Sequence, residues 1–345
     1  MEKHFLDEIY TKALESVIAE KKLNENQIEE FLTEQLTEEK IQNYYKEVID
    51  KFSKNTYKYF LEICPEEYHK SQVEAQNYQK HLDGIWKKGF ELSNAMYLFV
   101  LEELESYSNR LEAEHSDELK DSKYKCKVLQ LLANRNLQTF SAILTLLQNG
   151  FADQAYMLFR NMFENRVVSQ FILHNNEESA EQFYLGQVDD IRERNQKTYE
   201  WARISGVFSE KEHITFKRLY DKCMFDKAYG DTWYRQYQLA CKLLHTTPQG
   251  IAKTLASTRN GIEISLVGQT PYGLNLAAEH SAIMLEETVK NYLCLFHDQS
   301  NLMFVIVMHK WVGLIQEVYS EIGDSFIKDA LNNKDRVYEI NIIHN

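Results

Sequence analysis

Hydrophobic residues recur at helical spacing along most of the chain. In residues 117–150, leucine, isoleucine and phenylalanine fall three and four positions apart, and a glycine ends the stretch, as is common at a helix C-terminus. Residues 151–174 are apolar almost all the way round, which predicts a helix at the centre of a domain. Further helices are predicted over about 177–205, 209–228, 231–245, 275–297 and 300–321.

The N-terminal part has a weaker pattern. Residues 1–64 alternate polar and apolar groups at helical spacing and predict short surface helices, for which Asn24 and Thr37 are candidate N-terminal caps. Pro65, followed by two glutamates, predicts the start of another helix, because proline and acidic side chains are favoured in a first turn.

This second helical stretch is expected to reach about Ser116. Gly84 and Gly89 are candidates for a break or kink in it, because glycine weakens the interior of a helix.

One segment departs from the helical pattern. Four glycines lie between Gly250 and Gly273, around the run 262–266, whose period-two alternation predicts a short strand or an extended loop. The whole chain of 345 residues has only 12 glycines and 3 prolines, so few sharp turns are available. We therefore expect an all-α fold, a multi-helix bundle with an N-terminal helical region and at most one short β element.

Charge is unevenly distributed. The formal net charge is -13, and residues 1–125 contribute -10 of it, with 17 basic and 27 acidic side chains. A broad surface for duplex nucleic acid is not predicted, because phosphate contacts need clustered Lys and Arg. The charge distribution does not exclude a small local basic pocket. The change in composition predicts three parts: an acidic N-terminal helical region over 1–116, a C-terminal helical bundle domain over 117–321 and a C-terminal tail over 322–345.

Several features predict a cytoplasmic protein. The five cysteines are widely spaced without a C-x-x-C pair, so neither a zinc knuckle nor a disulfide framework is indicated. Acidic residues stand near the N-terminus where a signal peptide would carry its apolar core. The most apolar stretch, Leu302–Ile315, contains His309 and Lys310 and is shorter than the roughly 20 residues that span a bilayer. We expect a buried core helix there and no membrane partner.

Two charged residues lie within the apolar helix predicted over 151–174. Arg160 and Glu164 are one turn apart and share a face with Tyr156 and Phe163. One interpretation is a structural ion pair that joins neighbouring helices, since buried charges usually occur paired. The other is a site for an anion or a substrate, because an arginine fork matches phosphate or carboxylate and a glutamate can orient that fork or move a proton.

The helix predicted over 231–245 carries a second polar group. Tyr237 and Cys241 lie on one side of it, and His245 stands at the margin of that side, directly before a turn. A histidine at this position either stabilises the exposed carbonyl groups of the helix end when charged or serves as a general acid or base.

These residues resemble a known family pattern. The relevant run is Leu147-Gln-Asn-Gly-Phe-Ala-Asp-Gln-Ala-Tyr156, continued by Leu158-Phe-Arg160-Asn-Met-Phe-Glu164 and followed about 70 residues later by Tyr237 and His245. It resembles an uncharacterised bacterial family, a domain of unknown function, over about residues 130–320. In helical pattern and choice of polar residues, that family is similar to helical nucleases of the HEPN type from toxins and phage-defence systems.

The resemblance implies a toxin or phage-defence protein with metal-independent ribonuclease activity. Its candidate catalytic residues are Arg160, Glu164, Tyr237 and His245, acting on RNA or a nucleotide in a local pocket without a cofactor. The alternative is a non-enzymatic helical interaction or sensor module, in which the same residues form a structural network and the partner is a second copy or another protein.

The chain departs from the HEPN pattern in one respect. HEPN ribonucleases carry Arg and His on a single helix, separated by four to six residues, where the pair grips the phosphate and assists attack by the ribose 2′-hydroxyl. Here seven residues separate Arg166 from His174, and nine separate Arg235 from His245. Under this hypothesis Arg160 and His245 would have to meet from different helices.

Two Glu-x-x-His motifs have the spacing of metal ligands in helical bundles. They are Glu66-x-x-His69 and Glu112-x-x-His115. Both stand among polar and charged neighbours, so both are expected to face solvent, whereas ligands in such bundles project into an apolar interior. We therefore expect no metal site.

Overall fold

The computed structural model describes most of the chain between residues 38 and 332. The described residues are 15, 18–24, 27–28, 38–186, 199–223, 227–245, 248, 255–257, 263–265 and 268–332. They divide into two compact units, Met1–Asn77 and Tyr78–Asn345.

The described residues are predominantly helical, which confirms the all-α prediction. The helices are α3 (Glu38–Glu114), α4 (Glu118–Asp121), α5 (Lys123–Gln148), α6 (Ala152–His174), α7 (Glu177–Leu185), η2 (Glu200–Ser205), α8 (Phe216–Asp221), α9 (Lys227–Leu244), α11 (Leu274–Leu293) and α12 (Gln299–Asn332). Strands β1 (Leu255–Ser257) and β2 (Glu263–Ser265) pair antiparallel, with Ala256 opposite Ile264. Strand β2 lies within the run 262–266, where the sequence predicts a short strand or an extended loop, and its partner β1 was not predicted.

In the first unit, Asn24 caps a helical turn, as the sequence predicts. Its Oδ1 accepts a hydrogen bond from the backbone N–H of Gln27 (3.0 Å), and Oε1 of Gln27 accepts one from the backbone N–H of Asn24 (3.1 Å). This reciprocal arrangement satisfies two N–H groups that a helix start leaves without partners.

Helix α3 does not begin at Pro65. It starts at Glu38, directly after the predicted cap Thr37, which lies outside the described residues, and it continues through the proline. Proline removes one backbone hydrogen bond and leaves the carbonyl four residues earlier without its helical partner. That carbonyl belongs to Leu61, an exposed residue, so water can satisfy it and the helix can continue.

Gly89 of α3 marks a close helix contact in the second unit, whereas a Cβ atom at Gly84 would meet nothing within 4 Å. A Cβ atom at Gly89 would lie 2.7 Å from Cζ of Tyr319 in α12. Trp86 stacks on the same ring with centroids 5.8 Å apart, and the Ser93 hydroxyl donates to the Tyr319 hydroxyl at 3.3 Å. Glycine is therefore needed at position 89 because a buried ring occupies the space of its side chain.

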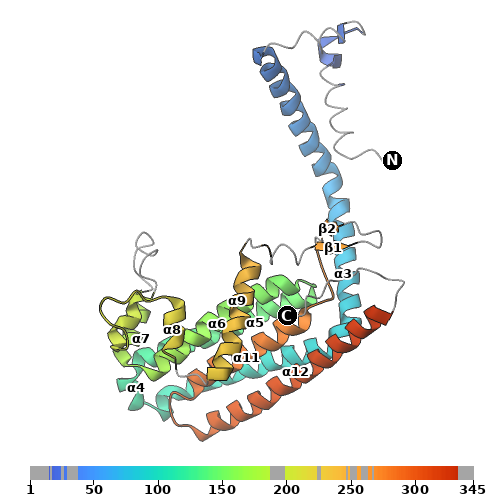
Figure 1. Ribbon diagram of the computed structural model, residues 1–345. Helices are drawn as coiled ribbons and strands as arrows, with labels where there is room; N and C mark the ends of the chain where they lie inside the picture. Colours follow the sequence, from blue (N-terminus) through green and yellow to red (C-terminus); the bar gives the residue numbers. More distant parts are fainter. Residues whose placement is uncertain are drawn as a thin grey trace. The chain divides into compact units, whose positions relative to one another are not determined.

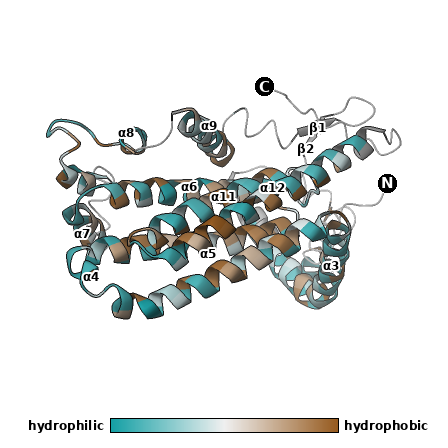
Figure 2. Ribbon diagram, turned by 90° about the horizontal axis from the view of Figure 1, so that it is seen from below, coloured by the Kyte–Doolittle hydropathy of each residue, from teal (hydrophilic) through white to brown (hydrophobic). Residues whose placement is uncertain are grey.

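The core of the second unit is built around α11. Helices α5, α6 and α12 all pack against α11, and α5 also packs against α6 (Figure 1). Apolar residues run along these helices (Figure 2). The same core includes α3 side chains from Leu82 to Leu111. The division between the two units therefore falls at Asn77 and Tyr78, and the boundary predicted near residue 116 lies inside the second unit.

Helix α5 ends at the glycine that the sequence assigned as its C-terminal signal. Gly150 has a φ angle of 76°, in the left-handed region that favours glycine. Its N–H donates to the Leu147 carbonyl (3.0 Å) and the Phe151 N–H donates to the Leu146 carbonyl (2.9 Å), which is a Schellman motif.

The segment after α6 is less regular than predicted. Within 177–226 the described helices are short: α7, η2 and α8. Residues 187–198 and 224–226, which are also part of the predicted helices, lie outside the described residues. By contrast, α9 and α11 agree with the predicted helices to within about four residues, because both have a clear apolar side.

Helix α12 is longer and more exposed than predicted. It includes the first part of the predicted tail, and residues 333–345 lie outside the described part. Among the described residues, Gln299–Phe326 is the one helical stretch long and apolar enough to cross a membrane by length and composition, and 39% of its most apolar window is buried. The core helix expected over Leu302–Ile315 is buried on one side only, because five apolar side chains on α12 are exposed: Leu302, Met303, Ile306, Val307 and Leu314.

Trp86→Ala tests whether α3 belongs to the core of the second unit. The indole is buried, stacks on Tyr319 and donates its Nε1–H to the Pro271 carbonyl (3.2 Å). We expect the variant to lose about 3–5 kcal/mol of unfolding free energy, as is typical of a large-to-small change in a core. Urea unfolding of the full chain, followed by circular dichroism, measures the loss.

Tyr68→Ala is the matched control, because Tyr68 is exposed on the same helix. Its unfolding free energy should stay within about 0.5 kcal/mol of the parent value. If Trp86→Ala left the main unfolding transition unchanged, residues 117–321 would hold a core of their own and the boundary near 116 would stand.

Candidate functional site

Three of the four predicted site residues meet between α6 and α9. Arg160 Nη2 lies 2.9 Å from Oε1 of Glu164, one turn later on α6. The hydroxyl of Tyr237, on α9, donates to the same Glu164 oxygen at 3.0 Å. The Arg160 guanidinium also lies over the Tyr237 ring, with Cζ 5.8 Å from the ring centroid. One carboxylate oxygen thus joins the two helices.

Aromatic packing fixes the position of Tyr237. Its ring stacks on Phe163 of α6 at 5.1 Å and lies 4.8 Å from the ring of Phe216 in α8. Because Phe163 neighbours Glu164 in the sequence, the same turn of α6 supplies both the packing surface and the hydrogen-bond acceptor for Tyr237.

The cluster is partly open to solvent. The side chains of Arg160 and Glu164 are 27% and 26% exposed, so neither is a fully buried charge. Nε of Arg160 is buried and has no hydrogen-bond partner among the described residues. The guanidinium therefore keeps one N–H that the described part of the chain does not satisfy.

The tyrosines of the cluster hold their protons at neutral pH. Burial, together with the negative charge of Glu164, raises the pKa of Tyr237 well above its ordinary value. Burial raises the pKa of the neighbouring Tyr199 to about 12, and Glu164 adds to this shift. Both hydroxyls therefore remain donors, which suits fixed hydrogen bonding rather than proton transfer near neutrality.

His245 does not join the cluster. It is exposed directly after α9, and its backbone N–H donates to the Cys241 carbonyl at 3.0 Å. It follows Tyr237 by eight residues, which corresponds to about 12 Å along a helix axis. In the described part of the chain, no hydrogen bond or ion pair links the His245 side chain to Arg160 or Glu164.

Arg166 is the deeply buried arginine of α6. Its side chain is 1% exposed, and Nη2 lies 3.3 Å from Oε2 of Glu287 on α11. Its guanidinium also lies over the ring of Tyr229 on α9, 5.6 Å from the centroid. Arg166, rather than Arg160, is therefore the deeply buried charge inside this apolar helix. Periodicity missed this because α6 is apolar nearly all round.

A second polar group between α6, α9 and α11 also escaped the sequence analysis. The Tyr156 hydroxyl donates to Oε1 of Gln236 (2.8 Å) and lies 3.1 Å from Nδ1 of His280. Trp233 packs edge-on against the imidazole at 5.0 Å. Burial lowers the pKa of His280 to about 4, so the ring is neutral at physiological pH. Its aromatic neighbours come from distant helices, so no local sequence signal could reveal its burial.

One hollow in the described structure lies away from the predicted pocket near residues 160 and 240. This hollow of about 780 Å³ lies between α3 and α5, and Leu101, Glu105, Gln138 and Thr145 are among its lining residues. None of the four predicted site residues lines it.

Comparison with known proteins gives a family match without an activity. Residues 127–262 match the model of a family of unknown function, DUF5677. This supports the predicted resemblance to an uncharacterised family, and the matched segment contains Arg160, Glu164, Tyr237 and His245. No curated protein and no solved structure matches the chain.

Arg160→Ala measures what the cluster contributes to stability. The variant leaves Glu164 with the Tyr237 hydroxyl as its remaining partner in the cluster. Breaking a fully buried pair costs about 3–5 kcal/mol, but solvent screens this one, so we expect a loss of about 1–2 kcal/mol in urea unfolding. His245→Ala should change the unfolding free energy by less than about 0.5 kcal/mol, because His245 is exposed. Equal losses of unfolding free energy in the two variants would contradict the prediction that Arg160 stabilises the fold and His245 does not.

Glu279→Gln tests a half-buried carboxyl on α11. Burial raises the pKa of Glu279 to about 7, and its Oε1 has no hydrogen-bond partner in the described structure. The folded-state pKa lies above the ordinary value of 4.5, so the folded chain binds the proton more tightly than the unfolded chain. The parent should therefore lose stability as the pH rises from about 4.5 to about 7, and the loss should persist above pH 7.

The variant cannot ionise at this position and should avoid that loss. At pH 8 it should be more stable than the parent by about 1–2 kcal/mol, a value reduced from the full shift because the group is partly exposed. At pH 4 the two proteins should have the same unfolding free energy. The pKa of His280 is lowered in the folded state, so both proteins lose stability alike as the pH falls below 6.5. The difference between their unfolding free energies therefore reports on Glu279 alone. A constant difference from pH 4 to pH 8 would rule out titration of Glu279 as its cause.

Proposed function

We propose that this protein is a non-enzymatic helical interaction module that binds a second copy of itself through the outer face of α12. The observation that carries the proposal is a stripe of exposed apolar side chains. We call it the α12 stripe, and its residues are Leu302, Met303, Ile306, Val307 and Leu314.

The members of the α12 stripe lie on one side of the helix, over about 18 Å. Leu302, Met303, Ile306 and Val307 span the first turn and a half, and Leu314 lies two turns beyond Val307, with the exposed Lys310 between them. The other side of α12 is already used, because Phe304, Met308 and Val312 are buried in the core. A stripe of this kind is typical of an interaction surface, because soluble monomers rarely expose large contiguous apolar patches.

Charge favours a protein partner over a lipid surface. Within Gln299–Phe326, Lys310 is the one Lys or Arg, and the chain carries a net charge of -13. Anionic membranes attract polybasic segments, so this face has little electrostatic affinity for them. A second copy fits well because, in a two-fold dimer, the same apolar stripe meets itself and each copy covers the other.

The Arg160 cluster has a structural role in this proposal. Glu164 is bonded to Arg160 and Tyr237, and the raised tyrosine pKa values favour fixed hydrogen bonds. Together these contacts support a joint that holds α9 on α6. The ribonuclease hypothesis stays a prediction, and the exposed position of His245 away from Arg160 gives it no support.

The double variant Ile306→Glu with Leu314→Glu tests the interface. Light scattering behind size-exclusion chromatography should give the parent a mass of two chains of 40.8 kDa and the double variant the mass of one. Two glutamates on each copy would place buried, unpaired charges in the shared stripe, which is strongly unfavourable. Leu131→Glu is the matched control, because Leu131 is exposed on α5, and it should remain a dimer.

Two outcomes would contradict the proposal. The first is a parent protein that stays monomeric over the whole concentration range. The second is a parent that floats with neutral or anionic lipid vesicles when the double variant does not. That result would assign the α12 stripe to a membrane surface.

A further inference from the structure

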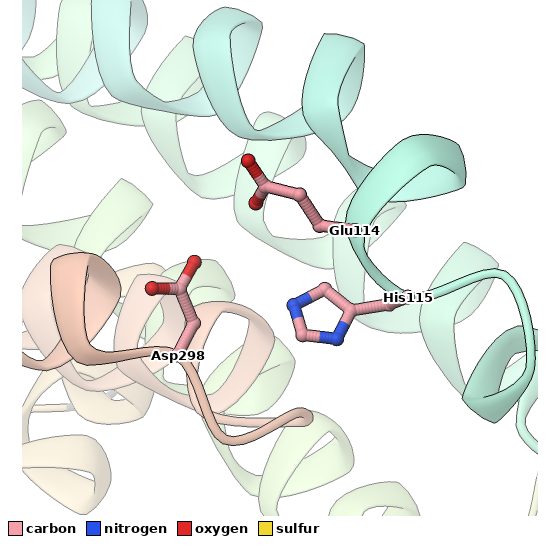
Figure 3. A group of neighbouring side chains, drawn as sticks. All are labelled: Glu114, His115 and Asp298. Atoms are coloured by element: carbon pink, nitrogen blue, oxygen red, sulfur yellow. The ribbon is translucent and has the colours of Figure 1, made fainter.

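Three side chains with metal-ligating atoms converge in the second unit. Glu114 and His115 stand at the end of α3, and Asp298 stands in the turn between α11 and α12 (Figure 3). One ligand atom from each residue lies within 4.8 Å of the other two. The cluster thus joins parts of the chain that are more than 180 residues apart in sequence.

His115 is buried, contrary to the prediction for the Glu-x-x-His motifs. The prediction is right for His69, which is exposed, but His115 is only 7% exposed. Phe296 stacks on its ring at 5.0 Å. Glu112 of the motif is exposed and lies outside the cluster, and the neighbouring Glu114 takes its place.

The imidazole of His115 lacks hydrogen bonds. Both ring nitrogens are buried, and neither has a hydrogen-bond partner among the described residues. Figure 3 shows one ring nitrogen directed toward the carboxylates of Glu114 and Asp298. Buried polar groups are normally satisfied, so an imidazole in this state indicates that a ligand completes the site.

Asp298 is held in place by the start of α12. Its Oδ1 accepts hydrogen bonds from the backbone N–H groups of Ser300 (2.7 Å) and Asn301 (3.4 Å). Its Oδ2 is buried without a hydrogen bond, and Arg110 Nη1 lies 3.6 Å away. One oxygen of this carboxylate therefore fixes the side chain and leaves the other for a cation.

The surrounding charges are not balanced. Arg110 lies 3.0 Å from Glu103 and 3.3 Å from Glu114 as well as close to Asp298, so three carboxylates share one guanidinium. The local net charge is -2 when all four groups are ionised. A divalent cation would balance this charge, and Arg110 alone does not.

We propose that Glu114, His115 and Asp298 bind a divalent transition-metal ion of the zinc class, with water completing the coordination. One imidazole nitrogen with two carboxylate oxygens suits Zn²⁺, whereas Mg²⁺ and Ca²⁺ prefer oxygen ligands throughout. Bonds of about 2.0–2.2 Å require donor atoms within about 4.4 Å of each other. Glu114 is 43% exposed, so its side chain can make this small adjustment.

Glu118 supplies the support that a ligating histidine normally has. Its Oε1 lies 3.6 Å from Nδ1 of His115. A small movement would let it accept the Nδ1–H while the other ring nitrogen ligates the metal, which is the usual arrangement of a carboxylate behind a ligating histidine. The bound ion would clip the end of α3 to the turn before α12.

The test uses the full chain, stripped of metal with a chelator and titrated with Zn²⁺ in a calorimeter. We expect one site per chain that Glu114→Gln and Asp298→Asn each weaken at least tenfold. Glu114→Gln spares the core because Glu114 is exposed, and asparagine at 298 can still cap α12. His115→Ala should abolish the site, but it also removes a buried ring, so it serves only as a supporting variant.

Two exposed histidines provide matched controls. His297 neighbours Asp298, and His69 belongs to the solvent-facing Glu-x-x-His motif. Their alanine variants should bind Zn²⁺ as the parent does. Binding of Co²⁺ should give an absorption spectrum without a thiolate charge-transfer band, because no cysteine is a ligand. The proposal is overturned if Glu114→Gln and Asp298→Asn retain the parent affinity, if His297→Ala loses the site, or if the parent binds no Zn²⁺.

Discussion

The burial of α11 constrains the rest of the second unit. Helices α5, α6 and α12 cover it, so the polar side chains it carries must find partners inside the protein. Thr288 accepts a hydrogen bond from Asn136 of α5 (2.8 Å), and Asn291 donates to Ser169 of α6 (2.8 Å). Apolar packing alone would tolerate sliding of these helices, but a slip of one turn would break both bonds. The polar pairs therefore fix the register of α5 and α6 on α11.

The burial of α11 also explains why the two arginines of α6 differ in exposure. Arg166 faces α11, is deeply buried and lies beside Glu287. Arg160 lies at the edge, where α9 covers α6 incompletely, and its ion pair with Glu164 stays partly exposed. The difference in burial means that an approaching anion could reach Arg160 but not Arg166. It also means that Arg160 contributes less to stability, because solvent screens its charge.

Periodicity predicted the helices well where a single apolar side was present, and the glycine at 150 correctly marked the end of α5. It also placed Arg160 and Glu164 on one face of α6, and the family resemblance joined Tyr237 to them as a candidate. It failed where the outcome depended on distant residues. The polar neighbours of His115 could not reveal that Phe296 covers its ring, and the hydrophobicity of α12 could not reveal which apolar side chains lack a covering helix. The prediction that a helix begins at Pro65 was wrong for a local reason. The carbonyl that loses its helical partner belongs to the exposed Leu61, so the helix tolerates the proline.

The two proposals meet at the start of α12. Asp298 caps this helix through Oδ1, and Leu302, the first member of the α12 stripe, follows one turn later. A metal ion on Oδ2 would tie that cap to Glu114 and His115 and so reduce the freedom of the first turn. A preorganised stripe loses less conformational entropy when a partner binds, so the metal would strengthen association without touching the interface. The coupling should be modest, because Ile306, Val307 and Leu314 lie farther along a helix that the core already holds in place.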